Sequence, residues 1–485
     1  MAQIDIIGLG PGSIGQLTLE AMEMLRDERN NYFRTKIHPV VSELETRGIR
    51  YESFDNLYET GESFEAVYSQ IADCLFEKAV QGESLVYAVP GNPLFGEQSV
   101  VKLIERCEAE NLSYQVYSGV SFVDVSMSVL EEDAVNGLKI IDAFEIRRQH
   151  PDKNMGNLIT QVFDRHMASE VKLALMDQYD PEFEVVLLIG AGIPDEERIL
   201  KLPLCEMDWV DGINHLTTLY VPPCPENLRD YGALLEIMEI LRSPEGCPWD
   251  RKQTRETLKP YLIEEAYEVL DAIENDDIDN LIEELGDVLL QVVFHAQLGA
   301  EEGMFSMNDI IEGINKKMVR RHPHVFGVPE DITAEAVVTN WDEIKKQEKQ
   351  TQTLSEEMDR IPKSFTALME AAKVQSKAAK VGFDWDDPLK ALEKVDEESR
   401  EVEAELRAEN PTKTEEEVGD LFFAAVNVAR LSGIQPELAL RKATDKFKER
   451  FRIVEDLVRA EGKEMQDYPL EALDRFWEQA KSLKN

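Results

Sequence analysis

The sequence predicts a multidomain protein, with an α/β domain over residues 1–222 and two all-α domains over residues 229–350 and 355–485. Three observations predict this arrangement. Short β-rich apolar runs alternate with amphipathic stretches before residue 222 and nearly vanish after it. The proline-rich segment 221–225 interrupts regular structure between the two halves, as a linker would. The second half repeats its own acidic motifs in the same order, which indicates a duplication.

In the first domain the apolar runs have the length of strands and are separated by helical patterns. They read, in order, IDIIGLG, SLVYAVPG, YQVYSGVS, LKIIDAF, VKLALM, EVVLLIGAG and LTTLYVPP. The first run ends in the glycine-rich turn Gly8–Gly12, and a helical stretch follows it. A dinucleotide site would need a further glycine at position 13, where Ser13 stands. Taken alone, the turn is interpreted as a tight connection required by close packing.

The second half shows long helical periodicities with dense charge on the opposite faces. We expect one buried apolar stripe in each copy of the repeat. The residues of the first stripe are Leu281, Leu285, Val288, Leu289 and Val292. Those of the second are Leu421, Phe422, Ala425, Val428 and Ala429.

The two copies share a series of motifs. GCPWD at 246–250 is echoed by GFDWD at 382–386, EEAYE at 264–268 by EESRE at 397–401, and EELGDVL at 283–289 by EEVGDLF at 416–422. The spacing between the two acidic motifs is 19 residues in both copies, from 265 to 284 and from 398 to 417. A basic pair and then a tryptophan follow each, namely Lys317 with Arg321 and Trp341, and Lys446 with Arg450 and Trp477.

Carboxylates at these spacings predict a metal site. Glu398 and Glu401 are three residues apart on one helix, and Glu417 and Asp420 are three apart on the next. Two antiparallel helices would bring the four together, although like charges repel, so a cation should hold them. Magnesium prefers oxygen ligands and bridges to substrate phosphates. A single such motif in a chain with 96 acidic residues would be interpreted as a solvated face, but the repetition favours the metal site.

Basic and aromatic residues downstream suggest a phosphate-bearing ligand. Lys446 and Arg450 lie one helical turn apart and offer a point charge and a planar fork for phosphate oxygens. Trp477 could stack on a base or could equally be a buried structural side chain.

Charge and composition indicate which partners and which cellular location to expect. A net charge of −44 repels nucleic-acid backbones and argues against a nucleic-acid partner. The five scattered cysteines lack CxxC pairs, which fits a reducing compartment. The start of the chain lacks a signal-peptide pattern, and no run of about 18 apolar residues predicts a membrane span. We therefore expect a cytoplasmic protein without a membrane partner.

The second half resembles the MazG family of all-α nucleoside triphosphate pyrophosphohydrolases, whose hallmark is EExxE followed by ExxD. The resemblance covers about residues 235–485 and includes GCPWD, RRHPHVF at 320–326 and VGFDW at 381–385. It implies that eight residues are magnesium ligands: Glu265, Glu268, Glu284 and Asp287, and Glu398, Glu401, Glu417 and Asp420. It also implies a nucleotide-contacting set of Lys413, Lys446, Arg450 and Trp477, which Lys317 and Arg321 echo in the first copy. Family members associate through such helices, so a homodimer is expected.

The reaction implied is hydrolysis of a nucleoside triphosphate to monophosphate and pyrophosphate, with water attacking near the α-phosphorus. Glu397 or Glu264, the first glutamate of each pair, would be the base, or would have a structural role. One departure separates the copies, because Lys413 precedes Glu417 by four residues while Asn280 stands at the equivalent position before Glu284. We therefore expect the C-terminal copy to carry most of the activity.

Residues 1–222 resemble the tetrapyrrole (corrin/porphyrin) methylase family, through GLGPG with LTLEA, VPGNP at 89–93 and SGVS at 118–121. The resemblance implies S-adenosylmethionine in a cleft between two α/β subdomains. The implied contacts are Gly10, Pro11, Gly12, Gly91, Asn92, Pro93 and Ser121. The family's GDP triplet is here Gly91-Asn92-Pro93, which bears on cofactor affinity. Two alternatives to the hydrolase stay open: a methyltransferase with an accessory helical half, and a non-enzymatic nucleotide-sensing scaffold.

Overall fold

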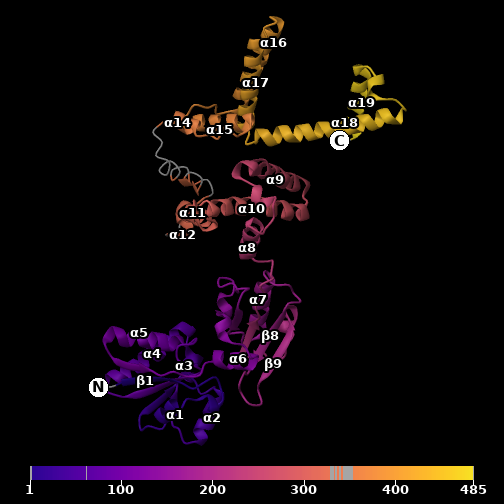
Figure 1. Ribbon diagram of the computed structural model, residues 1–485. Coiled ribbons are helices and arrows are strands. Elements are labelled where there is room, and N and C mark those ends of the chain that lie inside the picture. Colours follow the sequence, from indigo (N-terminus) through magenta and orange to yellow (C-terminus); the bar gives the residue numbers. More distant parts are fainter. Residues whose placement is uncertain are drawn as a thin grey trace. The chain divides into compact units, whose positions relative to one another are not determined.

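The computed structural model describes residues 3–61, 63–327, 332–333, 336–337, 340–341, 344 and 353–483. The chain divides into two compact units, Met1–Ile310 and Ile311–Asn485. The predicted domain ends at residues 1–2, 345–350 and 484–485 lie outside the described residues. The predicted fold class, an α/β first domain followed by helices, is confirmed (Figure 1).

A five-stranded parallel sheet opens the chain, with strand order β3-β2-β4-β1-β5. Its strands are β1 (Gln3–Gly8), β2 (Asn30–Phe33), β3 (Glu52–Ser53), β4 (Leu85–Val89) and β5 (Ser113–Val116). The helices of this part are α1 (Leu19–Leu25), α2 (Pro39–Thr46), α3 (Asp55–Thr60), α4 (Phe64–Val80) and α5 (Gln98–Glu110). Gly8 pairs with Val89, so β1 and β4 end at the same edge of the sheet. The loops that follow these strands therefore gather at one edge.

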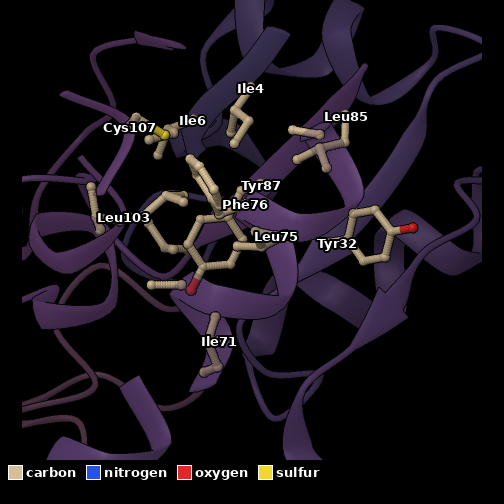
Figure 2. Packing of buried hydrophobic residues seen from close by; sticks show 14 of the residues in the cluster. Ile4, Ile6, Tyr32, Ile71, Leu75, Phe76, Leu85, Tyr87, Leu103 and Cys107 are labelled. Carbon is tan, nitrogen blue, oxygen red and sulfur yellow. The ribbon is translucent and has the colours of Figure 1, made fainter. Parts of the chain in front are cut away.

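Helices cover both faces of this sheet, so its central strands read as continuous apolar runs. Side chains of alternate residues point to opposite faces. On one face Ile4, Ile6 and Tyr87 pack against Ile71 and Leu75 of α4 (Figure 2). Ile7, Leu9, Val86 and Ala88 belong to a second buried cluster with residues of α1 and α2.

The second sheet is mixed, with strand order β6-β7-β10-β8-β9. Its strands are β6 (Leu138–Asp142), β7 (Gly156–Thr160), β8 (Glu184–Ile189), β9 (Arg198–Pro203) and β10 (Thr217–Val221). Only β6 and β7 pair in parallel among its neighbouring strands. Helices α6 (Phe122–Leu130) and α7 (Arg165–Met176) contribute to its two buried clusters. The predicted linker begins where β10 ends, at Val221.

The rest of the chain is helical. The elements are α8 (Tyr231–Arg242), α9 (Arg255–Asn275), α10 (Ile278–Glu301), α11 (Met307–Arg321), α12 (Pro323–Phe326), α14 (Leu354–Asp359), α15 (Ala367–Ala379), α16 (Pro388–Arg407), α17 (Pro411–Leu431), α18 (Pro436–Ala460) and α19 (Leu470–Leu483). Short 3₁₀ turns are η1 (Ile14–Gln16), η2 (Ala134–Asn136), η3 (Ala143–Glu145), η4 (Leu204–Trp209), η5 (Asp250–Lys252) and η6 (Met465–Asp467). Within the described residues, no helix combines the length and apolarity needed to cross a bilayer.

Two helix pairs carry the acidic motifs. α9 and α10 turn back on each other through Asp276 and Asp277, and α16 and α17 through residues 408–410 (Figure 1). In both turns a non-glycine residue adopts positive φ, Asp276 at 53° and Glu409 at 54°. The side chains of Asp277 and Asn410 then cap the second helix of each pair. The two copies therefore fold into the same antiparallel hairpin.

The prediction of buried apolar stripes is wrong for several residues. Leu285 is 51% exposed and Phe422 is 61% exposed. Leu289 and Ala425 are exposed as well. A two-helix hairpin can bury only the faces that its helices turn toward each other, and burial on α10 is concentrated in its second half, at Val293, Phe294 and Leu298 among others. Each hairpin thus presents an apolar outer face.

Candidate active site: two carboxylate clusters

The second hairpin holds three of its predicted ligands together. Glu398 and Glu401 of α16 and Glu417 of α17 each offer an oxygen within 4.8 Å of the others. Glu398 is buried, Glu417 half-buried and Glu401 exposed. A hydrogen bond to Glu398 and loss of solvent raise the pKa of Glu401, and the charges of Glu398 and Glu417 raise it further. This crowding of acids is the electrostatic condition that a bound cation relieves.

The first hairpin repeats the arrangement. Glu265 and Glu268 of α9 and Glu284 of α10 also bring an oxygen each within 4.8 Å of one another. Burial raises the pKa of Glu265 to about 7, and the charges of Asp287, Glu268 and Glu284 contribute. Loss of solvent and the charges of Glu268, Asp287 and Glu283 raise the pKa of Glu284. Asp287 therefore lies close enough to act on this cluster electrostatically.

The two predicted aspartate ligands stand outside these groups of three. Asp287 is half-buried and acts on Glu265 and Glu284 through its charge, whereas Asp420 is exposed on α17. The predicted bases also lie outside the groups. Glu264 is exposed. The Glu397 carboxylate lies 3.1 Å from the Lys394 ammonium.

Lys394 was not predicted and lies directly on the second cluster. Its Nζ is 2.5 Å from Glu398 Oε1, and hydrogen bonds to Glu398 and Glu397 raise its pKa. The signal was present in the sequence, because Lys394 precedes Glu398 by four residues and so lies on the same helix face. The equivalent residue four before Glu265 is Tyr261. The second cluster therefore has a lysine ammonium beside it, and the first cluster has a tyrosine at the equivalent position.

The donor set fits magnesium. Three carboxylates from two facing helices provide the oxygen ligands that Mg²⁺ prefers and leave further coordination positions for water or phosphate. The ligands approach from two rigid helices rather than from loops, which keeps their geometry defined.

The predicted nucleotide-contacting residues are spread over several elements of the second unit. Lys413 lies in the first turn of α17, with its Nζ 4.0 Å from Glu405 Oε1 and its side chain 59% exposed. Lys446 is exposed on α18, and Arg450, one turn later, is half-buried. Trp477 of α19 packs against Phe447, with ring centroids 5.0 Å apart. This contact gives Trp477 a packing role in the second unit.

Lys317 and Arg321 lie one turn apart on α11. They belong to the second compact unit, whereas Glu265, Glu268 and Glu284 belong to the first.

The predicted cofactor segments of the α/β domain meet at the edge where β1 and β4 end. The backbones of Gly10 and Gly91 exchange two hydrogen bonds, of 3.2 and 2.8 Å. A side chain at position 8 would place its Cβ 2.2 Å from the Gly91 carbonyl oxygen, so only glycine permits this approach. Gly10 and Gly91 have φ of 72° and 65°. Pro11, Gly12 and Pro93 complete the two loops.

Asn92 joins this pair of loops to the third segment. Its Nδ2 donates to the Gly119 carbonyl at 2.7 Å, and its Oδ1 accepts from the Leu94 amide at 3.0 Å. An aspartate could accept from Leu94 but could not donate to Gly119. The asparagine in place of the family's aspartate thus has a structural explanation. Ser121 is buried, and its hydroxyl caps α6 by accepting from the Asp124 amide at 3.3 Å, while it donates to the Asp124 carboxylate at 2.7 Å.

Comparison with known families agrees with the division into halves. The description "MazG nucleotide pyrophosphohydrolase domain" matches residues 253–326 and 387–454. The description "Tetrapyrrole (Corrin/Porphyrin) Methylases" matches residues 3–208. Both MazG segments include the acidic helices of one hairpin.

Individual relatives extend these matches. YabN of Bacillus subtilis is 45% identical over 486 residues, which cover 99% of this chain and 98% of that protein. The nucleoside triphosphate pyrophosphohydrolase/pyrophosphatase MazG of Thermotoga maritima is 49% identical over 51% of this chain and 94% of that protein. The nucleoside triphosphate pyrophosphohydrolase of Escherichia coli K12 is 49% identical over 51% of this chain and 95% of that protein.

Proposed function

Because the chain belongs to the MazG nucleotide pyrophosphohydrolase family, with a tetrapyrrole-methylase domain before two MazG segments, we propose that its helical half hydrolyses nucleoside triphosphates to monophosphate and pyrophosphate. The observation that carries the proposal is the gathering of three carboxylates in each hairpin. Relatives at 49% identity over the helical half are named for this activity.

Magnesium is the proposed cofactor. Glu398, Glu401 and Glu417 would hold it in the second hairpin, with Asp420 as a further ligand, and Glu265, Glu268, Glu284 and Asp287 would hold it in the first. When bound, the ion supplies charge neutralisation at the phosphates and a water of lowered pKa. Lys413, Lys446 and Arg450 would orient the triphosphate, and Trp477 would contact the base. Glu397 or Glu264 would accept the proton of the attacking water.

We assign most of the activity to the second copy. Lys413 lies in the first turn of α17 there, whereas Asn280, at the equivalent position of the first copy, has no charge to offer a phosphate. The second cluster also has Lys394 at its edge. Glu284→Ala should therefore weaken turnover only partly, while Glu417→Ala should abolish it.

The test is pyrophosphate release from a panel of nucleoside triphosphates, with and without Mg²⁺. Glu403→Ala is the matched control, since Glu403 lies on α16, outside the cluster, in an exposed pair with Arg407. Magnesium-dependent release that Glu417→Ala abolishes and Glu403→Ala leaves unchanged would support the proposal. Absence of release from every nucleotide would refute it, and the reverse ranking of Glu284 and Glu417 would refute the assignment of activity between copies.

A homodimer is proposed through the outer faces of the hairpins. Each hairpin has exposed apolar side chains along its helices, and the same face of a second copy would cover them. They are Leu262, Ile263, Ile273, Ile278, Ile282, Leu285 and Leu289, and Leu389, Leu392, Leu406, Phe422 and Phe423. Sedimentation should show a dimer that Ile282→Glu with Phe422→Glu converts to monomer. A wild-type monomer at micromolar concentration would contradict this.

S-adenosylmethionine is the proposed ligand of the first domain, at Gly10–Gly12, Gly91–Pro93 and Ser121. Calorimetry with S-adenosylmethionine tests it directly. The acidic surface fits the proposed lack of a nucleic-acid partner. The five free cysteines fit the proposed cytoplasmic location.

A further inference from the structure

A polar cluster in the α/β domain lies beside the glycine loops and contains none of the residues assigned a role above. Arg34 follows β2, His38 stands at the start of α2, Tyr58 lies on α3, and Glu97 stands at the start of α5. Arg34 is tied to β4 through its amide, which donates to the Ala88 carbonyl at 3.0 Å. The cluster therefore lies at the carboxyl ends of β2 and β4, the edge where open α/β sheets bind ligands.

Each of these four side chains has a buried polar atom that makes no hydrogen bond of good geometry among the described residues, although Tyr58 lies close enough to Arg34, and His38 to the Gly10 backbone, to interact with it. The atoms are Arg34 Nε, His38 Nδ1, Tyr58 Oη and Glu97 Oε2. Arg34 Nε and Glu97 Oε2 are 3.4 Å apart, which makes an ion pair without hydrogen-bond geometry. The Glu97 side chain is only 6% exposed. Buried polar groups are almost always satisfied in folded proteins, so four in one place require an explanation.

The surroundings are otherwise well ordered. The loop after β2 is held by Asp55, whose two carboxylate oxygens accept from the Thr35 hydroxyl at 2.6 Å and the Lys36 amide at 2.8 Å. The Tyr87 hydroxyl, on β4, is paired with Ser99 at 2.7 Å. The unsatisfied atoms are therefore held in place by a satisfied frame, which is the arrangement of a preorganised site.

We propose that Arg34, His38, Tyr58 and Glu97 form a binding site for a small ligand bearing a carboxylate or phosphate group, separate from the glycine segments assigned to S-adenosylmethionine. The Arg34 guanidinium and the Tyr58 hydroxyl supply donors to the oxyanion. Three aromatic rings supply a wall for the apolar part of the ligand. The ring centroids of Tyr58 and Phe64 each lie 6.3 Å from that of Tyr68, and Phe64 is 71% exposed.

The charge of the cluster favours an anion. Burial raises the pKa of Glu97 to about 7, although Arg34 opposes the shift. Burial lowers the pKa of His38 to about 4, and the Arg34 charge adds to this. Burial also raises the pKa of Tyr58 to about 12. Tyr68 and Tyr87 face the same groups and stay neutral. Arg34 is therefore the fixed charge, and Glu97, which is protonated in about half of the molecules near pH 7, can donate to the oxyanion in its protonated form.

The test uses calorimetry on the full chain in the presence of EDTA, which keeps divalent ions from the carboxylate clusters. The probes are benzoate and phenyl phosphate, one for each oxyanion, with neutral benzamide for comparison. We expect at least one anion to bind at least tenfold more tightly than benzamide. Arg34→Gln should weaken that anion tenfold or more. Arg47→Gln is the control, because Arg47 lies in an exposed pair with Glu43 on the same domain.

Two further variants separate ligand binding from a structural ion pair. Tyr58→Phe removes a hydroxyl that interacts with the Arg34 side chain but makes no hydrogen bond of good geometry, so the fold should be unchanged while anion affinity falls about threefold or more. Glu97→Gln removes the competing carboxylate and should leave affinity equal or higher at pH 8. Failure of both anions to bind, wild-type affinity in Arg34→Gln and Tyr58→Phe, or displacement of the anion by S-adenosylmethionine would each overturn the proposal.

Discussion

Glu97→Gln should stabilise the α/β domain at alkaline pH. The Glu97 carboxyl has a pKa of about 7 in the folded chain because burial disfavours its charge, against 4.5 for the group in its ordinary surroundings. The folded pKa is about 2.5 above the ordinary value, and since a tenfold change in an equilibrium constant is about 1.36 kcal/mol, ionised Glu97 costs the fold about 3 kcal/mol. Glutamine has the same shape as the protonated acid and never ionises.

The sign follows from proton linkage. Between pH 4.5 and 7 the folded chain holds a proton on Glu97 that the unfolded chain has released. Stability from this group is therefore fully present below pH 4.5 and is lost as the pH rises to 7. The variant and the wild type should be equally stable at pH 4.5, and the variant should lead by up to about 3 kcal/mol at pH 8.

The assay is urea-dependent amide exchange of β4, which reports opening of this domain rather than of the helical half. Exchange at pH 5 and pH 8 is compared after correction for intrinsic rates. Glu43→Gln is the control, since Glu43 is exposed and its loss should change stability by less than about 0.5 kcal/mol. A Glu97→Gln advantage that is equal at both pH values, or that reverses sign, would refute the reasoning.

Three predictions concern the carboxylate clusters. Glu401→Gln and Glu268→Gln should each weaken divalent-ion binding to their own cluster about tenfold or more, measured by Mn²⁺ titration, and unchanged affinity would count against those ligands. In a Glu417→Ala background, Mg²⁺ affinity at the first cluster should rise from pH 6 to pH 8, because the pKa of Glu265 is about 7 and its proton competes with the ion. Calorimetry in buffers of different ionisation enthalpy should detect the released proton, and a flat pH profile would contradict it. Lys394→Met should tighten Mn²⁺ binding in the absence of nucleotide, whereas Tyr261→Lys should weaken it, and no change in either would remove Lys394 from the cluster.

The fold class and the two clusters could be predicted because they depend on local patterns. Apolar runs that alternate with helical patterns predicted the strands, and the equal spacing of 19 residues between the acidic motifs predicted both helix pairs. Residues three apart share a helix face, so Glu398 with Glu401 needed only one tertiary contact to reach Glu417. The domain limits and the roles of the site residues stay predictions.

Other features depend on contacts that a single sequence does not encode locally. Arg34 and Glu97 are 63 residues apart and meet only because β2 and β4 are neighbours in a sheet whose strand order the sequence does not state. Phe422 was expected to be buried because it continues an apolar periodicity, but periodicity cannot tell burial within a chain from burial against a second one.

The two hairpins neutralise the same crowding of acids by different means. In the second, the Lys394 ammonium lies against Glu398, so an arriving metal ion meets a positively charged side chain already paired with one of its ligands. In the first, Tyr261 offers no charge, and a proton on Glu265, whose pKa is about 7, reduces the negative charge instead. A lysine displaced from Glu398 by metal remains at the site and can turn to the phosphates, whereas a released proton is lost to solvent. Together with Lys413 against Asn280, this places both additional positive charges in the second copy, which is the physical basis for assigning catalysis to it.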